Sequence, residues 1–582
     1  MPELDIVIKG GTIVDGTQVP AFVDDIGIKD GRIVEIGRIK PHRAKRVLDA
    51  TGLIVAPGFI DLHTHYDAQI HWDPYCTISG WHGVTSVVLG NCGFGFAPVR
   101  VEERERAMLA MTRNEAIPLD SMKAGMGWDW VTFPDWMNTL DRIPKGVNCK
   151  TYMAVSPLMI WAMGLDAAKS RDATEEETRE MQRLLHEAMD HGACGFSVQR
   201  LGRHSIQTDF DGTPMVTDTM SDELVMALAD VLRERGRGII QITQETQELG
   251  CERFGTMWEE NPDWDFESQL AAACGRPILH NLVIPLDTRP DVHQKSIAWI
   301  ERSNARGQRI FGQTLTGRSP YTYTLEDWNL YDTAPAWNEA LQGSIADRKR
   351  KLSDPDVRKR MVADSDDHRI AEEILGGPIK GLIIESVGPR DDLEHLVGKT
   401  VGDLAEETGK HPVEAMLDLS LDTDLKAAFQ TGNGNSNSPD VIADAMASQY
   451  TIPGVSDGGA HVKFLTGGSY TTDFLTWLVR DTGKFTLEQA HYKLSFLPAH
   501  AAGFHDRGYL REGAAADIVV YDLQNLRRTP EWGGVVAHDL PGNEWRRVQR
   551  SEGYRWVLVN GEITFEDGDC TGATPGRLLR DR

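Results

Sequence analysis

The sequence predicts an α/β fold, namely a TIM-like (β/α)8 barrel with a small β-sandwich module formed from both chain ends. Apolar β runs alternate with amphipathic helical stretches through the middle of the chain, as in a parallel sheet covered by helices. Short β-prone runs broken by Gly and Asp stand at both ends instead, which is typical of antiparallel strands. A chain of 582 residues can bury a large core and still carry an accessory module.

The two chain ends share one pattern. In residues 1–56, turn pairs such as Gly10-Gly11 and Asp30-Gly31 separate alternating apolar residues, which indicates a small antiparallel sheet. Residues 516–522 and 555–561 also have the composition of strands. We therefore expect residues 1–56 and 505–582 to meet in one β-sandwich module.

Residues 57–504 are predicted to form the catalytic barrel. Amphipathic helices are expected near 175–191 and 221–235. Strands are expected at residues 85–90, 195–198, 238–242, 276–280, 308–312 and 451–457. A barrel of this kind has its active site at the carboxyl ends of the strands.

An insertion is predicted at about 317–450, because this segment is long for two barrel units. It contains a basic, polar helix predicted over Ile345–Arg360. Two interpretations stay open, a lid over the active site and a solvated excursion with turn-rich loops.

Composition and charge exclude several classes of function. Lys and Arg number 61 against 87 Asp and Glu, a formal charge of −26, so we expect no nucleic acid as partner. The first residues have neither a basic nor an apolar leader region, and no apolar run is long enough to span a membrane; both features predict a cytoplasmic protein without a membrane partner. Seven scattered cysteines do not form a disulfide framework.

A histidine pair ends the first apolar strand of the predicted barrel. Residues i and i+2 of a strand project to the same face, so His63 and His65 can bind one ion while Thr64 points away. The alternative is a pair of core or surface histidines without a ligand. The neighbouring Asp61 and Asp67 favour a metal site, because carboxylates near a site orient the ligating imidazoles.

Three further residues follow apolar β runs. Cys92 is flanked by Gly93, so its thiolate can approach a cation closely, although a lone cysteine is more often a small core residue. His280 can complete a zinc site or be an ordinary buried histidine. Asp457 can bind metal and accept a proton from water, although an Asp before two glycines is also common in turns.

The order of these motifs resembles the amidohydrolase superfamily. The resemblance rests on Pro57–His65, on the strand-end pair Ser456-Asp457 and on the closing run Gly513–Val519. The stretch Gly90–Gly93 with Phe96–Pro98 narrows the resemblance to the D-aminoacylase branch, the N-acyl-D-amino-acid deacylases.

The resemblance implies a site with one or two zinc ions. The ligands that it implies are His63, His65, Cys92, His280 and Asp457. It also implies that Asp457 is the catalytic residue, acting as general base and then as general acid. Strand-end lysine is absent from residues 192–198, so Cys92 is the candidate for the bridging ligand.

Two positions depart from the deacylase pattern. Gln241 stands where the family has a ligating histidine, and an amide oxygen binds zinc far more weakly than imidazole. Thr243 stands where the family has an arginine that holds the substrate carboxylate. The candidate substrate-binding residues are Gln241, Thr243, Arg200, Arg318 and His461.

Aromatic residues are expected to overhang the strand ends, and about a third of them are predicted to line a pocket. They are Trp72, Trp81, Phe94, Phe96, Trp128, Trp130, Tyr321, Tyr323, Trp328 and Tyr331.

The function predicted from the sequence is zinc-dependent hydrolysis of a C–N amide bond in a small N-acylated substrate, an N-acyl amino acid or a related amide. A first alternative is a hydrolase of a cyclic amide, imide or lactone, which needs no carboxylate clamp. A second alternative is a non-catalytic scaffold that keeps the amidohydrolase-like barrel. The only partner expected is the small-molecule substrate, with a homo-oligomer as a possibility.

Overall fold

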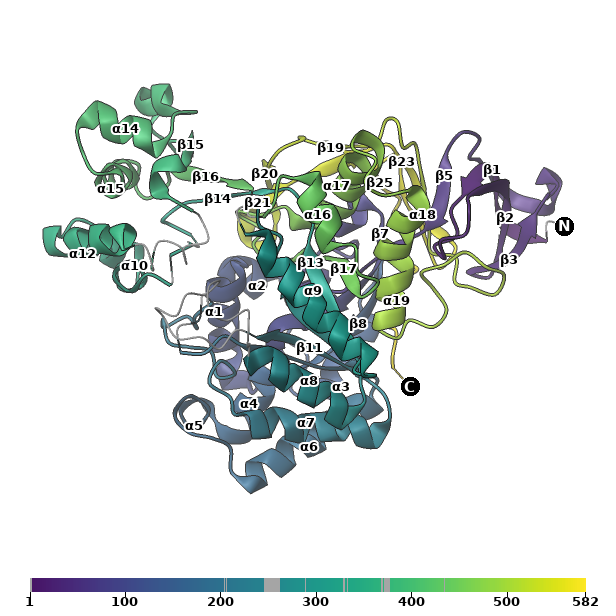
Figure 1. The fold of residues 1–582 in the computed structure, drawn as a ribbon, viewed down its shortest axis with the longest axis horizontal. Coiled ribbons are helices and arrows are strands. Elements are labelled where there is room, and N and C mark those ends of the chain that lie inside the picture. Colours follow the sequence, from purple (N-terminus) through teal and green to yellow (C-terminus); the bar gives the residue numbers. More distant parts are fainter. Residues whose placement is uncertain are drawn as a thin grey trace.

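The structure is a computed structural model that describes residues 3–581, except 204, 206, 245–261, 288, 328, 329, 332, 368, 369, 371–376 and 434. Figure 1 shows a central barrel body, with the N-terminal strands at one side and a helical lobe at the other.

The core of the body is a series of parallel strands. A three-stranded sheet has the order β6-β7-β8, and a six-stranded sheet has the order β17-β13-β12-β11-β10-β9. All pairs within both sheets are parallel. The strands are β6 (Phe59–Asp61), β7 (Val84–Leu89), β8 (Asn148–Thr151), β9 (Met153–Ala154), β10 (Gly195–Arg200), β11 (Ile239–Gln244), β12 (Ile278–Val283), β13 (Ile310–Leu315) and β17 (Thr451–Gly454).

The residues just beyond β6 and β17 bring the first and last strands together. Thr64 and Gly458 form a parallel bridge, and the His65 amide donates a hydrogen bond of 2.7 Å to the Gly458 carbonyl. The Ser456 hydroxyl donates to the His63 carbonyl at 3.1 Å. The two strand ends therefore meet at the edge of the barrel where an active site is expected, as the predicted fold class requires.

Helices cover the outer face of the barrel. The predicted helix near 175–191 is α6 (Glu175–Asp190), which begins with a capping box between Thr174 and Glu177. The predicted helix near 221–235 is α7 (Asp222–Arg235), which ends at Gly236 in the left-handed region. The other helices of the body include α1 (Arg104–Glu115), α2 (Leu119–Gly125), α3 (Phe133–Arg142), α4 (Val155–Met163), α5 (Leu165–Ser170), α8 (Pro262–Cys274), α9 (Pro290–Ala305), α16 (Pro439–Ala445), α17 (Tyr470–Asp473), α18 (Leu487–His491) and α19 (Leu497–Ala501).

Strands from both chain ends share one sheet. Its order is β25-β24-β23-β18-β5-β1-β2-β3, with β4 paired to β1, and β18 from the C-terminal part lies antiparallel between β5 and β23. Its strands are β1 (Leu4–Ile13), β2 (Phe22–Lys29), β3 (Arg32–Gly37), β4 (Ala44–Asp49), β5 (Ile54–Pro57), β18 (Ile518–Tyr521), β23 (Tyr554–Val559), β24 (Glu562–Glu566) and β25 (Asp569–Cys570). The two chain ends thus bury one shared apolar core.

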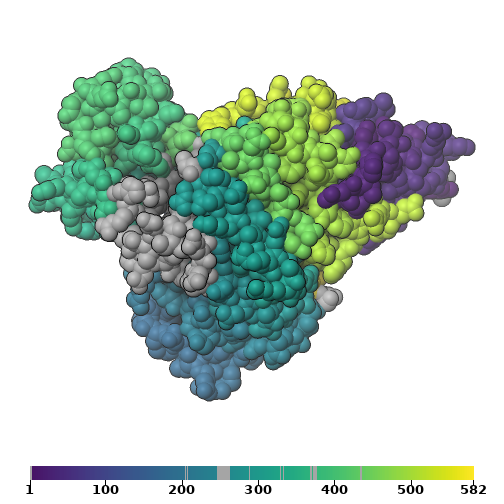
Figure 2. Space-filling model, in the orientation of Figure 1, coloured from purple at the N-terminus to yellow at the C-terminus, as the bar shows by residue number. Residues whose placement is uncertain are grey.

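The segment between β13 and β17 has a core of its own. It contains the antiparallel sheet β14-β16-β15, and Figure 2 shows it as a green lobe far from the purple N-terminal strands. Its elements include β14 (Pro320–Tyr323), β15 (Ile383–Ser386), β16 (Ala428–Asn433), α10 (Pro335–Ala340), α11 (Ile345–Leu352), α12 (Pro355–Asp366), α14 (Val401–Thr408) and α15 (Pro412–Asp422). The prediction of one helix over Ile345–Arg360 was wrong, because Asp354 caps a new helix that starts at Pro355.

None of the helices in the described residues combines the length and the apolar character that crossing a bilayer requires. The cytoplasmic location and the homo-oligomer stay predictions from the sequence.

Candidate metal centre

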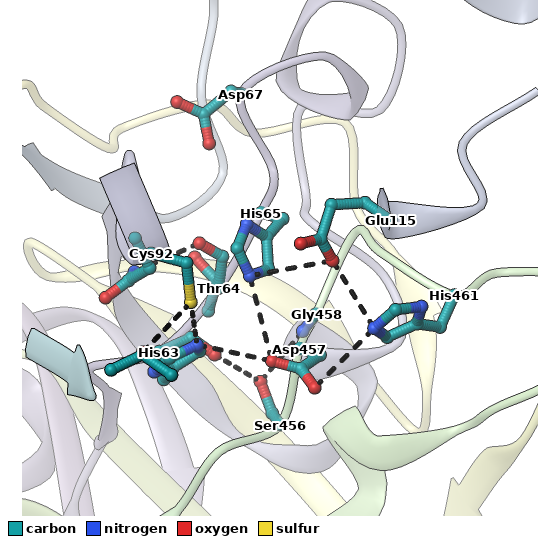
Figure 3. Close-up of polar contacts among 12 residues, drawn as sticks. His63, Thr64, His65, Asp67, Cys92, Glu115, Ser456, Asp457, Gly458 and His461 are labelled. Atoms are coloured by element: carbon teal, nitrogen blue, oxygen red, sulfur yellow. Dashed lines mark hydrogen bonds and ion pairs between the residues drawn. The ribbon is translucent and has the colours of Figure 1, made fainter. Parts of the chain in front are cut away.

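Three ligand side chains converge at the carboxyl ends of β6 and β7. The ligand atoms of His63, His65 and Cys92 all lie within 4.8 Å of one another, and all three residues are buried. Cys92 Sγ lies 3.3 Å from His63 Nε2. Figure 3 shows the two imidazoles and the thiol directed toward a common point.

The turn that carries Cys92 is held tightly. The Asn91 side-chain amide donates to the Thr64 carbonyl at 3.0 Å, which ties the two strand-end loops together. Cys92 has a φ of 57° and Gly93 a φ of 74°, the left-handed region that favours glycine. A Cβ on Gly93 would also lie 3.1 Å from the Val198 Cα. Glycine at 93 thus lets the thiol approach the histidines.

His63 is oriented by an amide. Its Nδ1 lies 3.3 Å from Gln313 Oε1, and because that oxygen only accepts, Nδ1 is the protonated nitrogen. The Nε2 lone pair is then available to the cluster. Burial lowers the pKa of His63 to about 4 and that of His65 well below its ordinary value, so both imidazoles are neutral near pH 7, as ligation requires.

The orienting role predicted for Asp61 and Asp67 was wrong. Asp61 accepts a hydrogen bond from the His63 backbone amide at 3.3 Å, and Asp67 accepts one from the Gly90 amide at 3.1 Å. These carboxylates hold the strand-end backbone. Burial raises the pKa of each to about 7.

Gln241 and Thr243 support the cysteine. The Cys92 backbone amide donates to Gln241 Oε1 at 2.7 Å, and Gln241 Nε2 donates to Thr243 Oγ1 at 3.0 Å. Asn281 Nδ2 donates to the same hydroxyl at 3.0 Å. Since that oxygen accepts twice, its own hydrogen is directed at Cys92 Sγ, 3.4 Å away. Gln241 and Thr243 thus make contacts within the protein, and the substrate contacts expected of them stay a prediction.

His280 lies outside the cluster, contrary to the ligand role expected for it. Its Nδ1 is 3.0 Å from Glu267 Oε1 on α8, and its ring packs edge-on against Trp299 of α9. The preceding Leu279 packs in the apolar cluster with Phe311, so the alternation of the strand turns His280 toward the outer helices.

Asp457 reaches the histidine pair, as predicted. Its Oδ1 lies 3.4 Å from His63 Nε2 and 3.8 Å from His65 Nε2, and its Oδ2 lies 3.9 Å from His461 Nε2. Burial, with a smaller effect from the charge of Asp61, raises the pKa of Asp457 to about 7. A carboxyl group with such a pKa is suited to exchange protons near neutral pH.

Glu115 is a member of the site that the sequence did not indicate. It ends helix α1, and its Oε2 lies 3.3 Å from His461 Nε2 and 3.8 Å from His65 Nε2. Burial, followed by the charge of Asp457, raises its pKa well above the ordinary range. No motif surrounds Glu115 in the sequence, whereas Gln313 could have been noticed because it directly follows an apolar β run.

The two candidate arginines have structural partners. Arg200 Nη2 lies 2.7 Å from Asp222 Oδ1. Arg318 Nη2 lies 2.8 Å from the buried Asp473, and its guanidinium stacks on Trp477. Both arginines thus form ion pairs within the protein, and the substrate contacts expected of them stay a prediction.

A small, open cavity with a mainly apolar lining lies beside the cluster. Phe94 lines it, and the Phe94 ring is 6.3 Å from the ring of His65. Helix α1 forms one wall through Ala107, Ala110 and Met111. The same helix thus presents an apolar wall to the cavity and, at its end, Glu115 to the histidines.

The other candidate pocket aromatics divide between core and site. Trp130 packs against Trp128 and Trp136, and Tyr323 and Tyr331 pack in the core of the lobe. Tyr321 is close enough to Asp457 that burial and the charge of this carboxylate raise its pKa to about 12. Trp328 lies outside the described residues.

Comparison with known proteins agrees with this fold over nearly the whole chain. The model of the amidohydrolase family matches residues 46–565. N-acyl-D-aspartate deacylase from Alcaligenes xylosoxydans xylosoxydans is 28% identical in an alignment that covers 99% of this chain and 95% of that protein. D-aminoacylase from the same organism is 26% identical, and the alignment covers 99% of this chain and 97% of that protein. The structure of N-acyl-D-glutamate deacylase from Bordetella bronchiseptica, solved with zinc and a phosphonate inhibitor, has a TM-score of 0.65 at 24% identity and covers 99% of this chain and 100% of that one.

The chain therefore belongs to the amidohydrolase family. Within this family it falls in the D-aminoacylase branch, because the similarity to these deacylases extends over almost the full length. The predicted fold class and the resemblance stated from the motifs are both confirmed.

Proposed function

We propose that the protein is a zinc-dependent hydrolase that cleaves the C–N amide bond of an N-acyl amino acid or a closely related small amide. The observation that carries this proposal is the convergence of His63, His65 and Cys92 with the carboxylate of Asp457 at one edge of the barrel. The similarity to D-aminoacylase and N-acyl-D-aspartate deacylase supports the amide bond as the target.

The chemistry of the four side chains suits a zinc ion. Two imidazoles, a thiolate and a carboxylate are ligands that zinc prefers. The separations between their ligand atoms include 3.3, 3.4 and 3.8 Å, close to the roughly 3.4 Å expected between ligands of a tetrahedral zinc ion. When bound, zinc supplies a water with a pKa near neutrality and polarises the scissile carbonyl.

Asp457 is proposed as the proton carrier. Its carboxylate lies 3.4 Å from His63 Nε2 and 3.8 Å from His65 Nε2, and this position allows it to take the proton of the attacking water and return it to the departing amine. Its side chain keeps 22% of its surface exposed, unlike the ligand histidines, so a substrate amide can reach it. The pKa of about 7 describes the carboxyl group without an ion beside it.

The cavity beside Phe94 is proposed to take the apolar part of the substrate. Its lining is mainly apolar, with Phe94, Val99, Ala110, Met111 and Ile160 among its residues, so an acyl chain or an apolar side chain would be released from water there.

The experiment is an amine-release assay with the purified, zinc-loaded protein. N-acetyl and longer N-acyl derivatives of D- and L-amino acids are offered, and the Asp457→Asn variant serves as the inactive reference. We expect release of free amine that stops on removal of zinc and falls by about 100-fold or more in Asp457→Asn. Full turnover in that variant would remove the role of Asp457.

The pairing of both candidate arginines within the protein favours a second candidate function, hydrolysis of a cyclic amide, imide or lactone. Arg200 and Arg318 are held by Asp222 and Asp473, and a cyclic amide, imide or lactone needs no arginine clamp for a free carboxylate. Hydantoins, cyclic imides and lactones therefore form a second arm of the assay. Ring opening without any amine release from linear substrates would decide for this alternative. A stable protein that binds no zinc would decide for a scaffold.

A further inference from the structure

We infer that the site holds a second divalent metal ion between Glu115, His461 and Asp457, on the side of Asp457 away from Cys92. This inference rests on the proposed function in one respect: Asp457 would contact both the zinc ion proposed above and the second ion. It assigns a ligand role to Glu115 and His461.

Asp457 faces two groups of ligands with its two oxygens. Oδ1 is directed at His63 and His65, at 3.4 and 3.8 Å, whereas Oδ2 is directed at His461 Nε2, at 3.9 Å. Glu115 Oε2 lies 3.3 Å from that same His461 nitrogen. Figure 3 shows Asp457 between the two groups. These separations suit side chains that share an ion, and a bridging carboxylate is common between two metals.

The buried carboxylate of Glu115 requires a positively charged partner. Its side chain keeps 1% of its surface exposed, and neither carboxylate oxygen has a hydrogen-bond partner among the described residues. A buried carboxylate without hydrogen bonds is costly unless a positive charge lies beside it. Its ion-pair neighbours among the described residues are His65 and His461. A cation between Glu115 and His461 would supply the missing charge.

The backbone holds these two side chains in place. Glu115 is the last residue of α1, and the following Ala116 ends the helix in the left-handed region. The His461 amide donates a hydrogen bond of 2.5 Å to the Glu115 carbonyl, so the two residues are fixed to each other by main chain as well. Ligands placed on such rigid elements need little rearrangement to bind an ion.

The side of Cys92 that faces Gln241 offers poorer ligands for a second ion than the side of Asp457 that faces Glu115. Gln241 Oε1 already accepts from the Cys92 amide, and the His280 imidazole pairs with Glu267 on the outside of the barrel. A second ion therefore finds a carboxylate and an imidazole near Glu115, and only an occupied amide oxygen near Gln241.

The test is the metal content of the full-length protein, which does not depend on turnover. Protein saturated with zinc and passed through a desalting column is analysed by plasma mass spectrometry. We expect two equivalents for the wild type and one for Glu115→Gln and for His461→Asn. Glu267→Gln is the matched control, because Glu267 is also buried against a histidine, His280, and should keep two equivalents.

Two results would overturn the inference. One is a wild type that binds a single equivalent, which would mean that a proton rather than a metal neutralises Glu115. The other is a wild type with two equivalents whose content is unchanged in both Glu115→Gln and His461→Asn. Circular dichroism establishes that each variant is folded, and His461→Asn provides the answer if Glu115→Gln does not fold. A wild type that binds two equivalents of zinc but releases no amine from any substrate would count against the proposed function. It would leave the second metal site unaffected.

Discussion

Gln313 Oε1 lies 3.3 Å from His63 Nδ1, on the opposite side of the ring from the Nε2 that faces Cys92. The amide thus determines which nitrogen of His63 is left to bind metal. Such outer contacts change metal affinity even though they never touch the ion.

Gln313→Leu should lower zinc affinity by about 10- to 100-fold, because the imidazole loses the acceptor that fixes its tautomer and orientation. The measurement is a competition titration with a chromophoric chelator. Gln313→Glu keeps an acceptor at the same position and should retain most of the affinity. Equal affinities in the wild type and Gln313→Leu would mean that the barrel wall alone orients His63.

Thr243→Val should make the thiolate of Cys92 harder to form. The variant loses the hydroxyl hydrogen directed at Sγ, while burial continues to raise the pKa of the thiol. Thiolate absorbance of the metal-free protein, with Cys92→Ser as the blank, should appear at higher pH than in the wild type. Thr243→Ser, which keeps the hydroxyl, is the control, and a shift of equal size in that variant would contradict the explanation.

Ala110→Phe should narrow the apolar cavity, because Ala110 lies in its helical wall and is buried. We expect kcat/KM for substrates with long apolar acyl chains to fall by about tenfold or more, the order of one or more lost methylene contacts. N-acetyl substrates, which leave the cavity empty, should be hydrolysed as before and act as the internal control. A uniform loss across all substrates would place the acyl group elsewhere.

The folded protein should lose stability below pH 6.5 because of buried neutral histidines remote from the metal centre. Burial lowers the pKa of His82 and of His491 to about 3, from an ordinary value of 6.5. The unfolded chain therefore binds more protons as the pH falls from 6.5 toward 3, and the free energy of unfolding decreases over that window. Each histidine should cost about 1.5 kcal/mol between pH 6.5 and 5.

The check is urea unfolding at several pH values in the wild type, His82→Gln and His491→Gln. His82 bonds to Thr472 at 2.7 Å and His491 to the Tyr521 hydroxyl at 2.8 Å, so each variant is expected to be less stable at pH 7. The slope of stability against pH should nevertheless be shallower in each variant. Parallel curves would assign the acid sensitivity to other groups.

Periodicity predicted much of this structure. The alternation of apolar residues located β7, β10 and β13, and the amphipathic pattern located α6 and α7 close to their ends. The spacing of His63 and His65 predicted their convergence, since side chains two apart on a strand share a face. These features depend on local patterns, which a sequence displays directly.

Two of the errors concern relations between distant segments. His280 and Leu279 are neighbours in the sequence, and only the packing of Leu279 with Phe311 shows which of them faces inward. Glu115 belongs to a helix outside the strand alternation, so no strand-end argument could locate it. The break in the lobe helix was readable, because Asp354-Pro355 is a typical start of a new helix.

The bridge between Thr64 and Gly458 bears on how the chain becomes active. Its partners are almost four hundred positions apart in the sequence, so a long loop must close before the bridge can form, at a cost in chain entropy. On a ribosome, the N-terminal ligands must wait until most of the polypeptide has emerged. Full-affinity zinc uptake during synthesis should therefore report the completed tertiary structure, because partly built chains lack the far side of the cluster.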